Sequence, residues 1–350
     1  MKKKIKLGIV GAGFISQTCH INSFYEQKNC EIIAIADKRK DIATKVAKHY
    51  GIKNIFFSHK ELISNNLPLD GVVIVTKRSM NGPIAYDFLK NGYNIFSEKP
   101  MCLSLSQAQK LLRIQKKKKL IFSVGYNKRF DYGVQKAKKK FLEILKKKKL
   151  GKIIYVKSHR FSGTGYLGAT EKFKSLQKYP NSTEWPSSPS WIKSKKEKYS
   201  FHGYLNTFSH NINLLRYFFN EEPKIHYVNM KEDQASLVVL KYKEFNCSIE
   251  SKNYKDETWD ENLVIYFQNG YLEINTPPQM KKNCCASYTI FNRKTLKKTN
   301  YKFKSKWSFY YQSNEFINNL KNKKNGILSS YDHIKDISLI EKIWKKWLKV

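Results

Sequence analysis

The residues with the clearest chemical meaning are two glycines, an acid and a lysine, each placed after a short apolar stretch. Gly11 and Gly13 follow the first stretch, Asp37 ends the next, and Lys99 stands after a third. A strand, a glycine turn, a helix and a second strand that ends in an acid form the dinucleotide-binding βαβ unit. The sequence therefore predicts binding of a dinucleotide.

The glycine turn has a physical reason at each position. Gly11 permits the tight turn, and Gly13 lets a pyrophosphate approach the NH groups at the start of the helix, where the helix dipole favours an anion. Phe14 and Ile15 open this helix and belong to the expected cofactor site. Ser16 replaces the third glycine of the motif, and its small side chain should still let helix and strand pack.

The acid after the second strand bears on the choice of cofactor. Asp37 is placed to accept hydrogen bonds from the adenosine ribose hydroxyls, which favours NAD over NADP. Lys38, Arg39 and Lys40 keep NADP open, because they could neutralise a 2′-phosphate.

The elements that must position these residues alternate between strand and helix signals. The continuous apolar run at residues 71–76 is typical of a strand buried on both faces of a parallel sheet. This pattern predicts a Rossmann domain with a doubly wound parallel sheet over residues 1–123. The expected strands are 5–10, 31–36, 71–76, 93–97 and 120–125, and the expected helices are 83–90 and 104–116, with Ser104 as a cap.

From residue 152 onward the pattern changes to strands joined mostly by short turns. Such a run predicts an antiparallel sheet, so residues 124–350 are expected to form an α+β domain whose last helix can pack back on the first domain. An aromatic loop at residues 166–191 either caps the cleft or covers the sheet. The expected strands are 153–161, 225–230, 235–242, 245–251, 262–267 and 271–275, with a helical segment at 204–219.

Composition limits the class of protein. The chain has 350 residues, 41% of them hydrophobic and 14% aromatic, which suits two globular domains. No apolar run approaches the length that crosses a bilayer. The six cysteines form no C-x-x-C pair, which favours reduced thiols over a zinc ribbon, so we expect a cytoplasmic protein without a metal site.

The net charge of +38 raises the question of nucleic-acid binding. Only seven of the 66 basic residues are arginine, the residue that phosphate and base recognition favours. The lysine-rich residues 136–152 alternate with apolar residues at helical spacing and predict a solvated helix face. We therefore expect no specific nucleic-acid partner, although a positive field would attract anionic small molecules.

Beyond these patterns, the chain resembles the Gfo/Idh/MocA family of nicotinamide-dependent oxidoreductases over essentially its whole length. The resemblance implies an N-terminal Rossmann domain, a C-terminal open-faced antiparallel sheet, and a sugar or polyol substrate between them. In relatives such sheet faces often mediate a dimer or tetramer. The motifs that carry it are the glycine turn, Ala36-Asp37, Val75-Thr76, Glu98-Lys99-Pro100, and the segments 125–130, 210–214, 269–272 and 329–332.

The resemblance also assigns catalytic roles. Lys99, flanked by Glu98 on the cofactor side, would be the positive group at the reacting hydroxyl. The family presents an acid and a histidine four residues apart, and here those places hold Asn206 and His210. Asn206 can hydrogen-bond a sugar hydroxyl but cannot accept a proton, so we expect His210 to act alone as the base.

Further residues have two open interpretations. Thr76 and Lys77 stand where the family commonly has Thr-Pro beside the cofactor, and Lys77 either contacts the pyrophosphate or is solvated. Tyr126, Asn127 and Arg129 follow the last strand of the first domain, where the family places substrate-contacting or helix-starting residues.

We therefore expect an NAD- or NADP-dependent dehydrogenase of a sugar, a polyol or a nucleotide-linked sugar, with no membrane partner, that forms a homodimer or homotetramer. The main alternative is a family member that has lost catalysis through Asn206 and serves as a cofactor-bound binding or scaffold subunit. A basic nucleic-acid-binding protein is the less favoured alternative.

Overall fold

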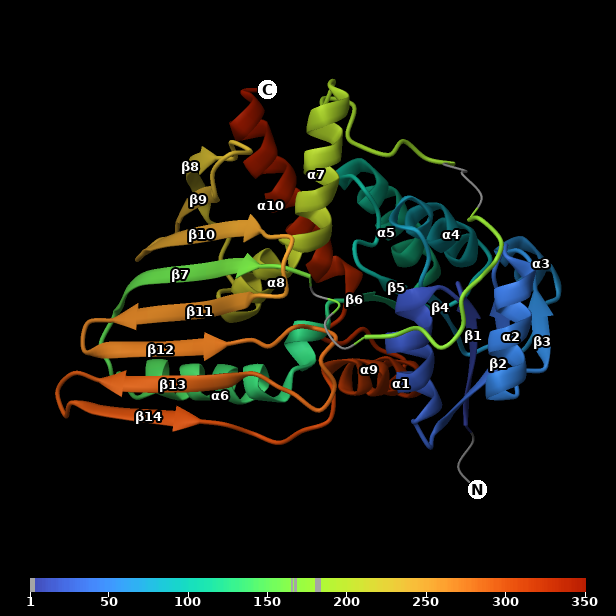
Figure 1. The fold of residues 1–350 in the computed structure, drawn as a ribbon, viewed down its shortest axis with the longest axis horizontal. Helices are drawn as coiled ribbons and strands as arrows, with labels where there is room; N and C mark the ends of the chain where they lie inside the picture. Colours follow the sequence, from blue (N-terminus) through green and yellow to red (C-terminus); the bar gives the residue numbers. More distant parts are fainter. Residues whose placement is uncertain (1–3, 165, 167–168, 180–183) are drawn as a thin grey trace. The chain divides into compact units, whose positions relative to one another are not determined.

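The chain is described by a computed structural model that covers residues 4–164, 166, 169–179 and 184–350. Residues 167–168 and 180–183 of the aromatic loop lie outside the described part. Two compact units can be distinguished, which we call the first and the second unit (Figure 1). The first comprises Met1–Tyr126, Thr170–Thr207 and Phe309–Ser338, and the second comprises Asn127–Ala169, Phe208–Ser308 and Leu339–Val350.

The first unit contains a six-stranded sheet in the order β3-β2-β1-β4-β5-β6. All of its strand pairs are parallel, which confirms the expected doubly wound Rossmann sheet. The order reverses at β1, and the carboxyl ends of strands at such a reversal border the ligand crevice of α/β sheets. The strands are β1 (Ile5–Val10), β2 (Cys30–Ala36), β3 (Asn54–Phe56), β4 (Gly71–Ile74), β5 (Ile95–Glu98) and β6 (Phe122–Gly125).

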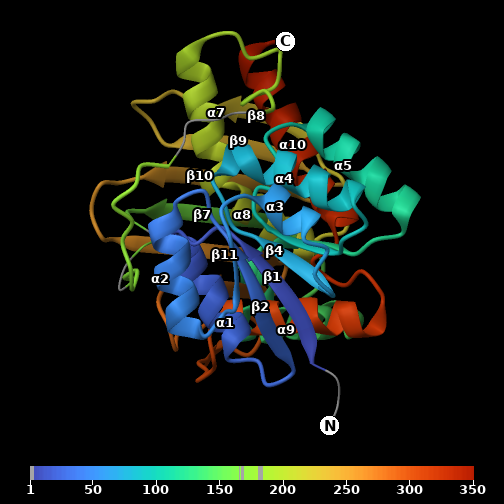
Figure 2. The same ribbon diagram turned by 90° about the vertical axis from the view of Figure 1, so that its right-hand side faces the viewer.

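Helices cover both faces of this sheet (Figure 2). On one face, Val72, Ile74 and Phe88 belong to a core shared with α3, α4 and α5. On the other face, the rings of Phe24, Phe96 and Phe316 pack with centroids 5.6 to 6.2 Å apart and join α1 and α9 to β5. The helices are α1 (Asn22–Tyr25), α2 (Lys40–Tyr50), α3 (His59–Ser64), α4 (Arg78–Lys90), α5 (Leu105–Lys118) and α9 (Ser308–Asn322), and the π-helix η1 (Ser16–Ile21) precedes α1.

One of the two helix starts expected from the sequence of this unit is observed, and the other is not. Ser104 caps α5 as expected, because its Oγ accepts a hydrogen bond from the backbone N of Gln107 at 3.3 Å. The start of α4 was expected at Pro83 but lies at Arg78. Pro83 therefore lies inside the helix, where its missing N–H removes one backbone hydrogen bond, and Met80 of the preceding turn is buried.

The second unit contains an eight-stranded sheet in the order β14-β13-β12-β11-β7-β10-β9-β8. The sheet is mostly antiparallel, as expected, with one exception: β10 pairs with β7 in parallel. A parallel pair needs a long crossover, and helical residues separate β7 from β8 in the sequence. The strands are β7 (Ile153–Ser162), β8 (Lys224–Asn229), β9 (Ser236–Lys241), β10 (Asn246–Asn253), β11 (Trp259–Phe267), β12 (Gly270–Asn275), β13 (Ser287–Asn292) and β14 (Lys297–Tyr301).

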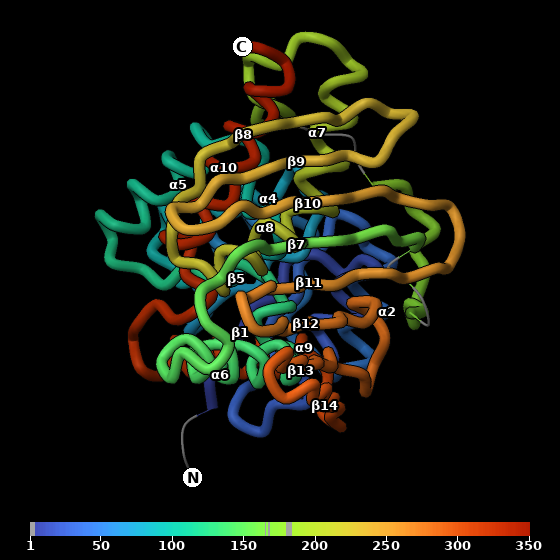
Figure 3. The backbone as a smooth tube through the Cα atoms, turned by 90° about the vertical axis from the view of Figure 1, so that its left-hand side faces the viewer, coloured from blue at the N-terminus to red at the C-terminus, as the bar shows by residue number. Residues whose placement is uncertain are grey.

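Two helices pack on one face of this sheet, α6 (Tyr132–Lys146) against β12 and β13, and α8 (Ser209–Phe218) against β7. Figure 3 shows the strands from the other face, from β8 to β14. The expected amphipathic helix is α6, in which Val134, Phe141 and Ile144 are buried. Its lysines leave the apolar stripe free to pack on the sheet.

The helical segment expected at residues 204–219 is two helices, which corrects the prediction of one continuous helix. The first is α7 (Lys195–Thr207), which belongs to the first unit, and the second is α8. The helix is interrupted at Phe208, whose carbonyl oxygen accepts hydrogen bonds from the backbone N atoms of Asn211 and Ile212 at 3.1 and 3.3 Å. Asn206 and His210 therefore lie on different helices. The closing helix is α10 (Ser330–Leu348).

None of the helices in the described part of the chain is long and apolar enough to cross a membrane. All six cysteines are present as thiols, and Cys284 and Cys285 are the two that are not fully buried.

We expect Ellman's reagent to modify Cys284 and Cys285 in the folded protein and all six thiols after unfolding. Burial raises the pKa of Cys30 to about 12 and that of Cys285 to about 11, so the thiolate of Cys285 is scarce at neutral pH and this accessible thiol should react slowly. Fast modification of four or more thiols in the native protein would contradict the buried positions.

Candidate active site

The glycine turn after β1 is tightly constrained. Gly11 has φ of +100°, and a Cβ atom there would lie 2.0 Å from the carbonyl oxygen of Val75, so only glycine fits. At Gly13 the nearest atom to an added Cβ is Arg39 Nη2, at 3.4 Å. Gly11 is thus required by the fold itself, whereas Gly13 leaves open space beside the backbone.

The helix that begins after this turn suits a phosphate group. Phe14 and Ile15 form its first residues, and the hydroxyl of Ser16 is buried without a hydrogen-bond partner among the described residues. A buried hydroxyl of this kind usually has a partner. Together with the glycine turn, it fits the pyrophosphate of a dinucleotide.

Asp37 lies directly after β2, and its carboxylate is fully engaged. Oδ2 accepts from Ala12 N at 2.7 Å and from Arg39 Nη2 at 3.1 Å, and Oδ1 accepts from Arg39 N at 2.9 Å and Nε at 3.1 Å. The neighbouring Lys38 is half-buried. Ribose hydroxyls that bind Asp37 must therefore compete with the Arg39 guanidinium.

Lys99 follows β5, and its ammonium group points to Asn206. Lys99 Nζ donates to the carbonyl oxygen of Asn206 at 2.7 Å and to its Oδ1 at 3.2 Å. Both residues belong to the first unit. The peptide bond between Lys99 and Pro100 is cis. Lys99 and Asn206 are thus in direct contact, although they lie 107 positions apart in the sequence. Both were expected in the site.

One amide side chain, Asn81 in α4, holds the backbone on both sides of Lys99. Its Nδ2 donates to the carbonyl oxygens of Glu98 and Pro100 at 3.1 and 3.2 Å. Its Oδ1 accepts from the Thr76 hydroxyl at 2.9 Å. Asn81 is 1% exposed, so these bonds are shielded from water. It joins the turn after β4, where cofactor contacts are expected, to the turn that carries Lys99.

Replacing Asn81 with aspartate should lower turnover about 10- to 100-fold while changing the NADH dissociation constant much less, because displacement of a catalytic group by about 1 Å has a cost of this order. The aspartate keeps the size of the side chain but faces two carbonyl oxygens without a proton to donate. Steady-state kinetics and NADH fluorescence titration measure the two quantities. Equal losses in both would mean that Asn81 only supports the fold.

The other expected cofactor residues of this unit differ in their surroundings. Glu98 Oε1 is paired with His20 Nε2 at 2.8 Å, and both side chains are buried. Lys77, at the start of α4, is exposed. The pairing of His20 with Glu98 was not expected, since the sequence gives the two residues no shared pattern.

In the second unit, the expected substrate residues are buried and have protein partners. Arg129 Nε and Nη2 donate to Asn213 Oδ1 and O at 2.8 and 3.1 Å, and Asn127 Nδ2 donates to Ser308 Oγ at 3.0 Å. His210, on α8, is 3% exposed. In the first unit, the ring of Tyr126 packs on His333 with centroids 4.8 Å apart.

The second unit also contains a buried group of charged side chains. Lys128 Nζ pairs with Glu261 Oε1, and the Thr276 hydroxyl donates to Glu261 Oε2 at 2.9 Å. Arg160, also buried, lies with its guanidinium 5.2 Å from the ring centre of Trp259. Burial opposes ionisation of Glu261, but the charges of Lys128 and Arg160 outweigh it and lower the pKa of Glu261.

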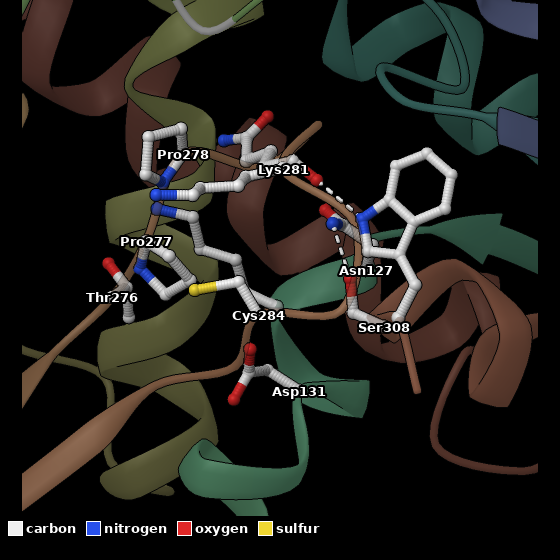
Figure 4. A pocket seen from close by; sticks show the side chains of 11 residues that line it. Asn127, Asp131, Thr276, Pro277, Pro278, Lys281, Cys284 and Ser308 are labelled. Atoms are coloured by element: carbon white, nitrogen blue, oxygen red, sulfur yellow. Dashed lines mark hydrogen bonds between the residues drawn. The ribbon is translucent and has the colours of Figure 1, made fainter. Parts of the chain in front are cut away.

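A small cavity beside these charges is shown in Figure 4, and its walls come from the second unit. Asn127, Cys284 and Ser308 are among the residues around it. Its volume of about 10 Å³ has room for one water molecule and is too small for a sugar. Among the described residues there is also no group of three or more His, Cys, Asp or Glu side chains that could hold a metal ion.

Comparison with known proteins bears on the family and the fold. Residues 5–126 match the GFO_IDH_MocA model, the oxidoreductase family with an NAD-binding Rossmann fold. An oxidoreductase from Formosa agariphila is 25% identical over 239 residues, 67% of either chain. The scyllo-inositol 2-dehydrogenase (NAD(+)) of Bacillus subtilis is 27% identical over 157 residues, which span 45% of this chain and 44% of that protein.

A solved structure extends the likeness of fold to nearly the whole chain. The myo-inositol 2-dehydrogenase from Lactobacillus plantarum superposes with a TM-score of 0.71 at 17% identity, over 98% of this chain and 97% of that one. At this identity the likeness concerns the fold alone.

Proposed function

From the membership of residues 5–126 in the Gfo/Idh/MocA oxidoreductase family, we propose that this protein is an NAD(P)-dependent dehydrogenase of a polyol or sugar. The observation that carries the proposal is Lys99, held with its ammonium group on Asn206 and its backbone on Asn81, directly after a strand of a dinucleotide-binding sheet.

The proposed roles follow from the chemistry of each side chain. A nicotinamide supplies the hydride acceptor or donor when bound. The Lys99 ammonium would hydrogen-bond the reacting oxygen and stabilise negative charge that develops there. His210 would take the hydroxyl proton, since imidazole exchanges a proton near neutral pH. Asn206, which cannot accept a proton, would orient Lys99 through its two oxygens.

The substrate class is proposed from the relatives, whose named substrates include scyllo-inositol and myo-inositol. These neutral polyols present several hydroxyls of the kind that amide and lysine side chains bind. The net charge of +38 would also attract anionic substrates, so nucleotide-linked sugars belong in the test panel.

The proposal is tested by following NAD(P)H absorbance with inositols, hexoses and nucleotide sugars, in the wild type and in His210→Ala. The control is His226→Ala on β8, which changes a histidine outside the proposed site. Turnover that His210→Ala lowers and His226→Ala leaves unchanged supports the proposed base. Tight dinucleotide binding with no turnover across the panel favours the binding-subunit alternative.

We also propose that the chain associates with a second copy of itself through the outer face of the eight-stranded sheet. Four rings form a row across neighbouring strands there: the Tyr155, Tyr266, Tyr271 and Phe291 centroids are 6.1, 6.1 and 5.5 Å apart in that order. Such an aromatic row suits an interface core. Light scattering on the wild type and on Tyr266→Glu tests it, because a monomeric wild type would contradict the proposal.

A further inference from the structure

Residues 172–179, here called the strap, contact the helical segments that follow the glycine turn and Asp37. The first tie is to Gln17 in η1, four residues after Gly13. Gln17 Nε2 donates to the carbonyl oxygen of Phe173 at 3.0 Å, and Phe173 N donates to Gln17 Oε1 at 3.0 Å. This two-way pairing fixes the strap beside the helix that begins at the glycine turn.

The second tie is to Asp41 in the first turn of α2, four residues after Asp37. The Ser175 hydroxyl donates to Asp41 Oδ1 at 2.7 Å, and Leu176 N donates to Oδ2 at 2.7 Å. The Ser175 hydrogen bond is the main cause that lowers the pKa of Asp41, so the carboxylate is ionised at neutral pH. Hydrogen bonds to an ionised acceptor are stronger than neutral ones.

The third tie reaches the carboxylate expected to bind ribose. The guanidinium of Arg39 lies 5.4 Å from the ring centre of Tyr179 and donates to both oxygens of Asp37. Burial raises the pKa of Tyr179 to about 12, so its phenol is neutral. A ribose hydroxyl that displaces Arg39 from Asp37 must also disturb the contact between Arg39 and Tyr179.

We propose that the strap is the outer wall of the dinucleotide site and encloses the adenosine end, so that the dinucleotide enters and leaves only when the strap opens. The three ties lie shortly after Gly13 and Asp37 and therefore flank both turns that the binding motif uses. The proposal rests on dinucleotide binding by the first unit and adds residues 172–179 to that site.

The test is stopped-flow binding of NADH and NADPH to the full chain. Asp41→Asn turns one acceptor oxygen of the second tie into a donor, and Tyr179→Ala removes the ring of the third. In the double variant we expect the association and dissociation rate constants both to rise about tenfold, the effect of losing a charged hydrogen bond that holds a closed state. Thr44→Ala, on the exposed face of α2, is the matched control and should leave both rates unchanged.

Trypsin cleavage after Lys172, Lys174 and Lys178 gives a second readout, and NADH should slow it in the wild type more than in the double variant. Unchanged rate constants in the double variant would overturn the strap while leaving the dehydrogenase proposal standing. Tighter binding with an unchanged dissociation rate would overturn it too, since the strap would then occupy the place of the adenosine. If the wild type binds neither NADH nor NADPH, both proposals fail together.

Discussion

Replacing Lys99 with alanine should reduce turnover by about 10²- to 10³-fold, the usual contribution of one hydrogen-bond donor that stabilises charge developing on the reacting oxygen. NADH binding should remain, because Lys99 Nζ donates to Asn206, whereas the pyrophosphate and the ribose are expected at the glycine turn and Asp37. Stopped-flow binding and steady-state kinetics on the same preparation separate the two effects. Lys99→Arg should also be slow, since its larger, planar guanidinium keeps the charge but cannot place it where the compact ammonium group lies.

The matched control for this prediction is Lys116→Ala, which removes an exposed lysine from α5 of the same unit. It should retain wild-type turnover. If Lys99→Ala and Lys116→Ala had the same rates, Lys99 would be one more surface lysine, and the assignment of the active site to the turn after β5 would be wrong.

Replacing Glu261 with glutamine should destabilise the second unit by about 3 to 5 kcal/mol, the usual cost of leaving a buried charge without its partner. Arg160 would remain buried and charged, and Lys128, whose pKa burial already lowers, would lose its carboxylate partner. Urea unfolding followed by tryptophan fluorescence measures the loss. Glu273→Gln, a half-buried acid on β12 of the same sheet, is the control and should change stability by less than about 0.5 kcal/mol.

The pH dependence gives this prediction a second readout. Because the pKa of Glu261 is lowered in the folded state, its stabilising contribution is present above the ordinary glutamate value and is lost as the pH falls through the lowered one. The stability gap between wild type and Glu261→Gln should therefore narrow in acid. Adding Lys128→Met to Glu261→Gln should recover part of the lost stability. If it does not, the unpaired Lys128 is not the cause of the loss.

The Rossmann sheet could be predicted from the sequence because its signals are local. Apolar runs, a glycine turn and Asp37 each lie within a short stretch, and the strands they predicted are close to those observed. Three strands were missed: β3 (Asn54–Phe56), β13 (Ser287–Asn292) and β14 (Lys297–Tyr301). The short β3 and the lysine-rich β14 have little apolar pattern of their own and form by pairing with a neighbouring strand.

The contacts that could not be predicted from the sequence join residues that lie far apart along the chain. Gln17 and Phe173 are 156 positions apart, so no local pattern joins them. Lys128 is one lysine in a lysine-rich chain, and only the fold distinguishes it by burying it against Glu261. The part played by Asn81 becomes clear only from its hydrogen bonds to the carbonyl oxygens on both sides of Lys99.

The most direct test of the central claim is whether hydride moves from a polyol carbon to the nicotinamide. The protein is incubated with NAD⁺ or NADP⁺ and inositols or sugars deuterated at their carbinol carbons, and the reduced cofactor is analysed by mass spectrometry. We predict reduced cofactor that carries one deuterium atom from the substrate, at a rate that falls in Lys99→Ala. Tight cofactor binding without deuterium transfer from any member of the panel would contradict the dehydrogenase assignment.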